Sequence, residues 1–167
     1  MSSGNRPIRD GVIVGLIASV AVAVFYAFFD LLAARGTLYT VDLLGKAVFR
    51  GLRDPAILQL PVKPDPRVIM LYNLMHLVIS LAIGLVVTGL VGYAERHPSR
   101  SRPVIAVIVA GFFVTVAAVG ALTAPFRPLL PWWSIVLANA LAVLCAASYL
   151  VRRRRGVWRR LTSLRAQ

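Results

Sequence analysis

The chain has 167 residues, of which 59% are hydrophobic and only 15% are charged, and its mean hydropathy is +0.78. Soluble domains carry roughly 45–50% apolar and about 25% charged residues, so this composition excludes an ordinary water-soluble globular protein. The net charge of +13 arises from basic residues that flank long apolar runs, which indicates a membrane and not a nucleic acid as the partner. The single cysteine excludes an internal disulfide, and no Cys/His cluster has metal-ligand spacing.

Four apolar segments are each long enough to cross a bilayer. A hydrocarbon core about 30 Å thick needs about 20 apolar residues, and such runs are helical because lipid offers no hydrogen-bond partner to an open backbone. The first segment is too long for the apolar core of a signal peptide, so we expect it to be a span. These observations predict an all-α integral membrane protein, a four-transmembrane-helix bundle forming a single domain over 1–167. The spans are 11–34, 68–94, 104–124 and 132–151.

The basic residues predict the orientation. Twelve of the 19 lie in the N-terminal segment, in the loop between the second and third spans and in the tail 152–167, whereas seven lie on the other side, diluted over a longer loop. Because cytoplasmic segments carry the excess of Lys and Arg, we expect both termini to be cytoplasmic in an inner (plasma) membrane. Trp132 and Trp133 would then start the fourth span at the outer interface.

Small residues recur at every fourth position in three of the four spans. Apolar side chains gain little by leaving lipid for another helix, so membrane helices pack where small residues let their backbones approach. We predict that these stripes hold the bundle together, with packing against a second subunit as the alternative. They are Gly11, Gly15, Ser19, Ala23 and Ala27, then Ser80, Gly84, Thr88 and Gly92, then Ser134, Ala138, Ala142 and Ala146.

The segments outside the spans are also patterned. Residues 41–53 have the apolar spacing of a short amphipathic helix, which we expect to lie on the outer membrane surface, with Thr40 capping its start. The tail is expected to contact anionic lipid headgroups, and a simple stop-transfer signal is an equal alternative. The lipid-contact candidates are Arg152, Arg153, Arg154, Arg155, Arg159 and Arg160.

Polar side chains within the spans are the candidates for chemistry, because intramembrane polar groups are costly and usually face the protein interior. At 1.5 Å per residue, Asp30, His76 and Asn139 lie about 6, 12 and 10 Å below the outer ends of their spans. We expect His76 to donate a hydrogen bond to Asp30, with Asn139 completing the network. The full candidate cluster is Asp30, Tyr72, Asn73, His76 and Asn139.

This cluster has a structural and a functional interpretation. A buried Asp–His–Asn network can fix helix register, or it can handle a proton, a small polar ligand or a quinol-like headgroup. Ligation of a haem or chlorophyll by His76 is a further alternative, but the spans hold no second His and we predict no cofactor. Phosphate loops, GxSxG, HExxH and paired intramembrane carboxylates are absent from the sequence. We therefore expect a non-enzymatic accessory or scaffold protein whose partner is another membrane protein or a second copy.

Three stretches carry a resemblance: FDLLAARGTLYTVDLLGKAVF after the first span, YNLMH at the start of the second and WWSIVLAN at the start of the fourth. They are similar to segments of a family of small, uncharacterised bacterial four-span membrane proteins. The resemblance implies a bacterial inner membrane and transfers no activity. It also implies that the Asp, His and Asn shared by that family correspond to Asp30, His76 and Asn139.

Overall fold

The computed structural model describes residues 5–51 and 63–153, and within these ranges every regular element is helical. Four helices are long and apolar enough to cross a membrane, as the sequence predicts. The elements are α1 (Asn5–Leu32), α2 (Tyr39–Phe49), α4 (Pro66–Arg96), the 3-10 turn η1 (Pro98–Arg100), α5 (Ser101–Leu122), the 3-10 turn η2 (Ala124–Phe126) and α6 (Trp132–Arg153).

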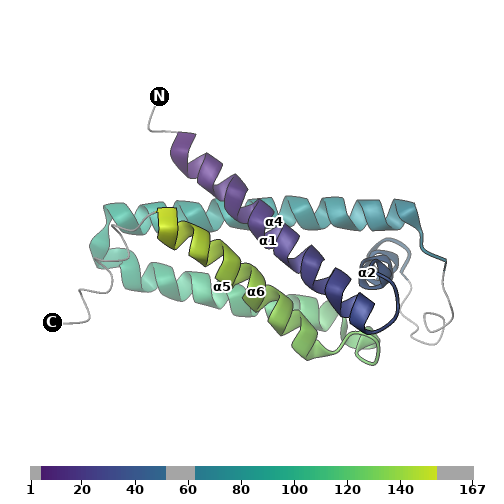
Figure 1. Ribbon diagram of the computed structural model, residues 1–167. Helices are drawn as coiled ribbons and strands as arrows, with labels where there is room; N and C mark the ends of the chain where they lie inside the picture. Colours follow the sequence, from purple (N-terminus) through teal and green to yellow (C-terminus); the bar gives the residue numbers. More distant parts are fainter. Residues whose placement is uncertain (1–4, 52–62, 154–167) are drawn as a thin grey trace.

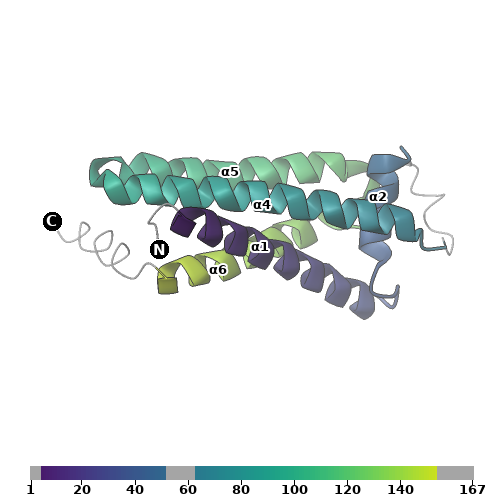
Figure 2. The ribbon, with the colours of Figure 1, turned by 90° about the horizontal axis from the view of Figure 1, so that it is seen from above.

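The four long helices form two layers. In both views α4 and α5 run alongside each other, while α1 and α6 make a second layer that crosses α4 obliquely (Figures 1 and 2). The start of α1, the end of α4, the start of α5 and the end of α6 lie at one end of the bundle, which we call the terminal end. Helix α2 lies crosswise at the other end, which we call the α2 end.

The contact between α1 and α4 brings two backbones together at glycines. A Cβ placed on Gly15 would lie 2.6 Å from Leu81 Cα and 2.7 Å from Ser80 O, and one placed on Gly84 would lie 2.6 Å from Gly15 N. A Cβ on Gly84 would also collide with the carbonyl oxygen of Gly11. No larger residue fits without separating the helices, so this crossing depends on the small-residue spacing of both.

The small residues of the three stripes differ in how far they are buried. Helix α6 packs against α1, and its Ala138 belongs to a core cluster with Tyr26 of α1 and Ile135 of α6. Ala23 is exposed, so not every residue of the α1 stripe is packed against a neighbouring helix. The buried stripe residues are Gly11, Gly15, Gly84, Thr88, Ser134, Ala138 and Ala142, and the half-buried ones are Ser19, Ala27, Ser80, Gly92 and Ala146.

Helix α2 occupies most of the segment 41–53 in which a short amphipathic helix is expected. It ends at Phe49, it packs against α4 and α1, and both Asp42 and Lys46 are buried in it. A Cβ placed on Gly45 would lie 3.0 Å from the carbonyl oxygen of Val68, so α2 packs closely on the first turns of α4. Helix α4 has 31 residues and is therefore about 46 Å long. This length exceeds a hydrocarbon core of about 30 Å, so the first turns of α4 can extend beyond the core and contact α2 there. Residues 52–53 lie outside the described ranges.

Helix α5 contributes little to the interior. Its only buried residues are Ser101 and Val104 in its first turn, and the rest of the helix is half-buried or exposed. Large apolar side chains such as Phe113 and Val114 project from it, with exposed fractions of 64% and 67%. Most of the apolar surface of α5 therefore lies outside the interior of the bundle.

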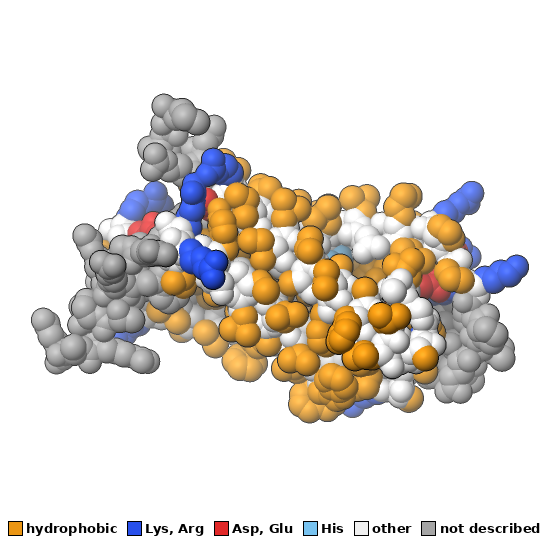
Figure 3. Space-filling model, viewed as in Figure 1, with side chains coloured by type: hydrophobic (Ala, Val, Ile, Leu, Met, Phe, Trp, Pro, Cys, Tyr) orange, Lys and Arg blue, Asp and Glu red, His pale blue; other side chains and the backbone are white. Residues whose placement is uncertain are grey.

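The outer surface separates apolar from charged side chains. On the face shown in Figure 3, hydrophobic side chains cover the middle, and Lys, Arg, Asp and Glu gather towards the two ends of the bundle. A soluble protein would not expose an apolar band of this extent. The surface and the four long helices together define a multi-pass membrane protein.

Candidate functional site

Asp30 is a fully buried charged side chain at the α2 end. Its Oδ2 accepts the backbone N–H of Thr40 at 2.7 Å, and its Oδ1 accepts the Thr40 hydroxyl at 2.6 Å. The Asp30 side chain has no exposed surface, and Thr40 is 1% exposed. Since Thr40 lies in the first turn of α2, Asp30 satisfies a backbone donor that an N-cap side chain would usually take. A carboxylate is also favoured at this helix terminus by the dipole.

Arg35 extends this contact to the loop before α6. Its Nη2 lies 4.0 Å from Asp30 Oδ1, and its Nη1 donates to the carbonyl of Leu129 at 2.9 Å. The guanidinium also stands over the rings of Tyr39 and Phe29, at 4.7 and 5.4 Å from their centroids. We call Asp30, Arg35 and Thr40 the Asp30 clasp, because they join α1, α2 and the loop before α6.

A tight turn places Arg35 beside Asp30. Ala34 adopts a left-handed conformation with φ of 54°, and the N–H of Arg35 returns to the carbonyl of Asp30 at 3.0 Å. This is the pattern of a helix that ends in a Schellman motif, where glycine is the usual left-handed residue. The turn therefore holds some backbone strain at Ala34.

A second polar group, the α2 network, joins α2 to the start of α4. Lys46 pairs with Asp42 one turn away, and both side chains are buried. Lys46 Nζ also donates to the carbonyl of Lys63 at 3.1 Å, and Asp42 accepts the backbone N–H of Asp65 at 3.0 Å. Asp65 in turn caps α4 and pairs with Arg50. The network comprises Asp42, Lys46, Arg50 and Asp65.

His76 lies between α1 and α4, away from the Asp30 clasp. Its Nδ1 is 3.3 Å from Ser19 Oγ, within hydrogen-bonding distance, and its ring stacks on that of Tyr72 with 6.5 Å between centroids. Ser19 belongs to the α1 stripe, so one residue both permits close packing and supplies a polar partner. His76 is half-buried.

The expected hydrogen-bonded network of Asp30, His76 and Asn139 does not form. Among the described residues Asp30 bonds to Thr40, His76 contacts Ser19, and Asn139 donates to Ile135 in its own helix at 2.8 Å. Sharing a depth below the outer interface did not bring the three side chains together, because depth leaves the direction around each helix and the crossing of the helices undetermined. The amides of Asn73 and Asn139 each satisfy themselves on a carbonyl one turn back.

Thr40 also differs from its expected role. The residue at the N-cap position of α2 is Leu38, which makes no side-chain capping bond, and Thr40 lies inside the first turn. The interactions of Arg35, Asp42, Lys46 and Asp65 were not expected from the sequence pattern. The signal available was the i,i+4 spacing of Asp42 and Lys46, which is typical of a helical ion pair but does not say that the pair is buried.

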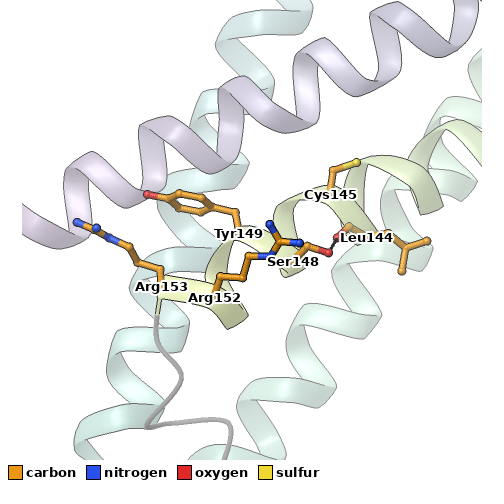
Figure 4. Close-up of a pocket in the computed structure, with 6 residues that line it drawn as sticks. All are labelled: Leu144, Cys145, Ser148, Tyr149, Arg152 and Arg153. Atoms are coloured by element: carbon orange, nitrogen blue, oxygen red, sulfur yellow. Dashed lines mark hydrogen bonds between the residues drawn. The ribbon is translucent and has the colours of Figure 1, made fainter.

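The terminal end has its own polar contacts. Asp10 of α1 is 4% exposed; it accepts a hydrogen bond from the Tyr149 hydroxyl at 3.3 Å, and its Oδ1 lies 3.5 Å from Arg153 Nε. A groove of about 560 Å³ lies beside these residues along the end of α6 (Figure 4). It is lined by Leu144, Cys145, Ser148, Tyr149, Arg152 and Arg153. Of the basic tail, residues 154–167 lie outside the described ranges.

The described residues include no group of three or more His, Cys, Asp or Glu side chains that could hold a metal ion. The site and fold together define the class: a multi-pass helical membrane protein with a buried polar network at one end of its bundle. Comparison with protein-family models, curated proteins and solved structures finds no match to this chain. The resemblance to small four-span bacterial proteins therefore stays a prediction from the sequence.

Proposed function

We propose that the protein is a non-enzymatic accessory or scaffold protein of a bacterial inner membrane, and that its buried charges serve the fold. The observation that carries this proposal is the enclosure of Asp30, whose two oxygens have partners on Thr40 and whose side chain is 0% exposed. A residue that takes up a proton or a ligand in a membrane protein faces a water-filled cavity or a pathway. Asp30 instead joins the end of α1 to the start of α2.

The lateral surface supports the scaffold role. Beyond Val104, α5 has no fully buried residue, and only Val119 packs against the core cluster, although α5 is one of the four membrane-length helices. The helix is thus available to contact another membrane protein or a second copy, while α1, α4 and α6 hold the fold. In this proposal a partner contacts α5 from within the bilayer.

A second candidate function has one observation in its favour. His76 lies within a membrane-length helix, and only its Nδ1 contacts another described polar group. Its Nε2 makes no hydrogen bond to any other described residue, so this ring nitrogen is available to bind a proton or a small ligand. This rival keeps the proton- or ligand-handling hypothesis but moves it from Asp30 to His76.

Complementation separates the two functions. Asp30→Asn keeps the shape and two-sided hydrogen bonding of the side chain but removes its charge, and His76→Phe removes the imidazole. An accessory role predicts that both variants, once shown to fold, rescue the defect of a deletion strain. Failure of folded His76→Phe alone would favour the rival, and failure of folded Asp30→Asn would contradict the structural role of its carboxylate.

The orientation is part of the proposal. We infer from the basic residues that both termini and the η1 loop are cytoplasmic and that α2 lies outside. Reporter fusions after Gln167 and near Asp54 test this directly. A periplasm-dependent reporter should be active near Asp54 and inactive after Gln167, and the reverse pattern would overturn the orientation.

A further inference from the structure

The groove at the end of α6 has two kinds of wall. Leu144 and Cys145 line the part further from the end of the helix, and Ser148, Tyr149, Arg152 and Arg153 line the part nearest to it. Leu144 is 64% exposed, so an apolar side chain borders the groove where α6 enters the apolar band. The groove thus passes from apolar to basic over three helical turns (Figure 4).

Two of its polar residues contact Asp10 of α1, and the Ser148 hydroxyl donates to the carbonyl of Leu144. Tyr149 donates to Asp10, and Arg153 pairs with the same carboxylate. Figure 4 shows both side chains directed towards α1. They form a fixed side of the groove, and Asp10 offsets the charge of Arg153.

Arg152 differs from Arg153. It is exposed and makes no hydrogen bond or ion pair with another described residue. In Figure 4 its side chain turns back beside Ser148 and not outward from the end of the helix. The guanidinium therefore stands at the edge of the groove, where α6 would leave the hydrocarbon core.

We propose that this groove binds an anionic phospholipid, with the headgroup phosphate on Arg152 and an acyl chain along Leu144. A guanidinium presents paired N–H donors that match phosphate oxygens, and the apolar wall continues towards the membrane interior as an acyl chain does. The described basic residues at this end outnumber its acidic residues, Asp10 and Glu95. The basic residues are Arg9, Arg96, Arg100, Arg102, Arg152 and Arg153. The inference does not depend on the accessory role.

The test is native mass spectrometry of the full chain in detergent, titrated with phosphatidylglycerol or phosphatidylcholine. We expect tighter binding of phosphatidylglycerol, because choline brings a cation close to Arg152. Arg152→Gln should weaken phosphatidylglycerol binding about fivefold, the effect of one basic residue near an anionic lipid surface. Arg96→Gln is the matched control, since it removes an exposed charge from the same end but outside the groove.

The outcomes separate a site from a diffuse attraction. Equal weakening by Arg152→Gln and Arg96→Gln, or none by Arg152→Gln, would overturn the proposal. Leu144→Ser tests the acyl wall and should weaken binding without changing the charge. Inorganic phosphate at constant ionic strength should not displace the lipid; displacement at low millimolar concentration would assign the groove to free phosphate instead. Unchanged thermal unfolding of each variant establishes that a loss of binding is not a loss of fold.

Discussion

The α1–α4 crossing and the α2 end are held together by different kinds of contact. At the crossing Gly15 and Gly84 bring backbones into contact, and the interaction is one of shape and dispersion. At the α2 end the contacts are hydrogen bonds and ion pairs, among them the buried pair Asp42–Lys46. Inside lipid a helix satisfies its own backbone, whereas helix ends and turns present donors and acceptors that need other partners. The difference predicts that the two regions fail in response to different substitutions.

The largest effect should come from breaking the α2 network on one side only. Lys46→Met leaves Asp42 buried without its cation, and removal of one partner of a buried pair costs about 3–5 kcal/mol. We expect this loss in the free energy of unfolding, measured by denaturant titration in mixed micelles. Lys63→Met, which changes an exposed side chain, is the control. Equal stability of the two variants would show that the Asp42–Lys46 pair does not hold α2 in place.

The α1–α4 crossing should be destabilised by added side-chain volume and not by the loss of a charge. Gly84→Ile inserts a side chain where even a Cβ meets backbone atoms of α1, and such overpacking costs about 1–3 kcal/mol. Gly89→Ile on the same helix is the control, because a Cβ there has nothing within 4 Å. If both variants unfold at the same denaturant concentration, the backbone contact is not what joins α1 to α4.

These two regions also differ in how far the sequence predicts them. Four spans and the packing role of Gly84 follow from composition and a four-residue period, because both are local properties of one helix. The partners of Asp30 and His76 do not follow, because they depend on the turn at Ala34 and on the angle at which α1 crosses α4. A polar residue can thus be predicted to face inward while its partner stays undetermined.

The Asp30 clasp should give a smaller effect when only its hydroxyl is removed. Thr40→Val keeps the shape and the backbone N–H bond to Asp30 but deletes the hydroxyl donor, so we expect a loss of about 1–2 kcal/mol. Thr115→Val is a suitable comparison, because that hydroxyl bonds only to the carbonyl of Gly111 in its own helix. A greater loss for Thr115→Val would place the stabilising bond elsewhere.

The smallest expected effect is a gain in stability. Ala34→Gly relieves the left-handed backbone at the end of α1, and after the added flexibility of the unfolded chain is subtracted we expect about 0.5 kcal/mol of stabilisation. Ala33→Gly, one residue earlier and without a positive φ, should destabilise. Thermal unfolding in detergent distinguishes the two signs, and destabilisation by both would contradict the turn.

The central claim, that Asp30 serves the fold through Thr40 and not through His76, is tested most directly by two double-mutant cycles. The first combines Asp30→Ala with Thr40→Val, and the second combines Asp30→Ala with His76→Phe, each read as free energy of unfolding in the same micelles. The structure predicts a coupling of about 1 kcal/mol or more between positions 30 and 40, and a coupling within about 0.5 kcal/mol of zero between positions 30 and 76. Coupling between positions 30 and 76 without coupling between 30 and 40 would contradict the account.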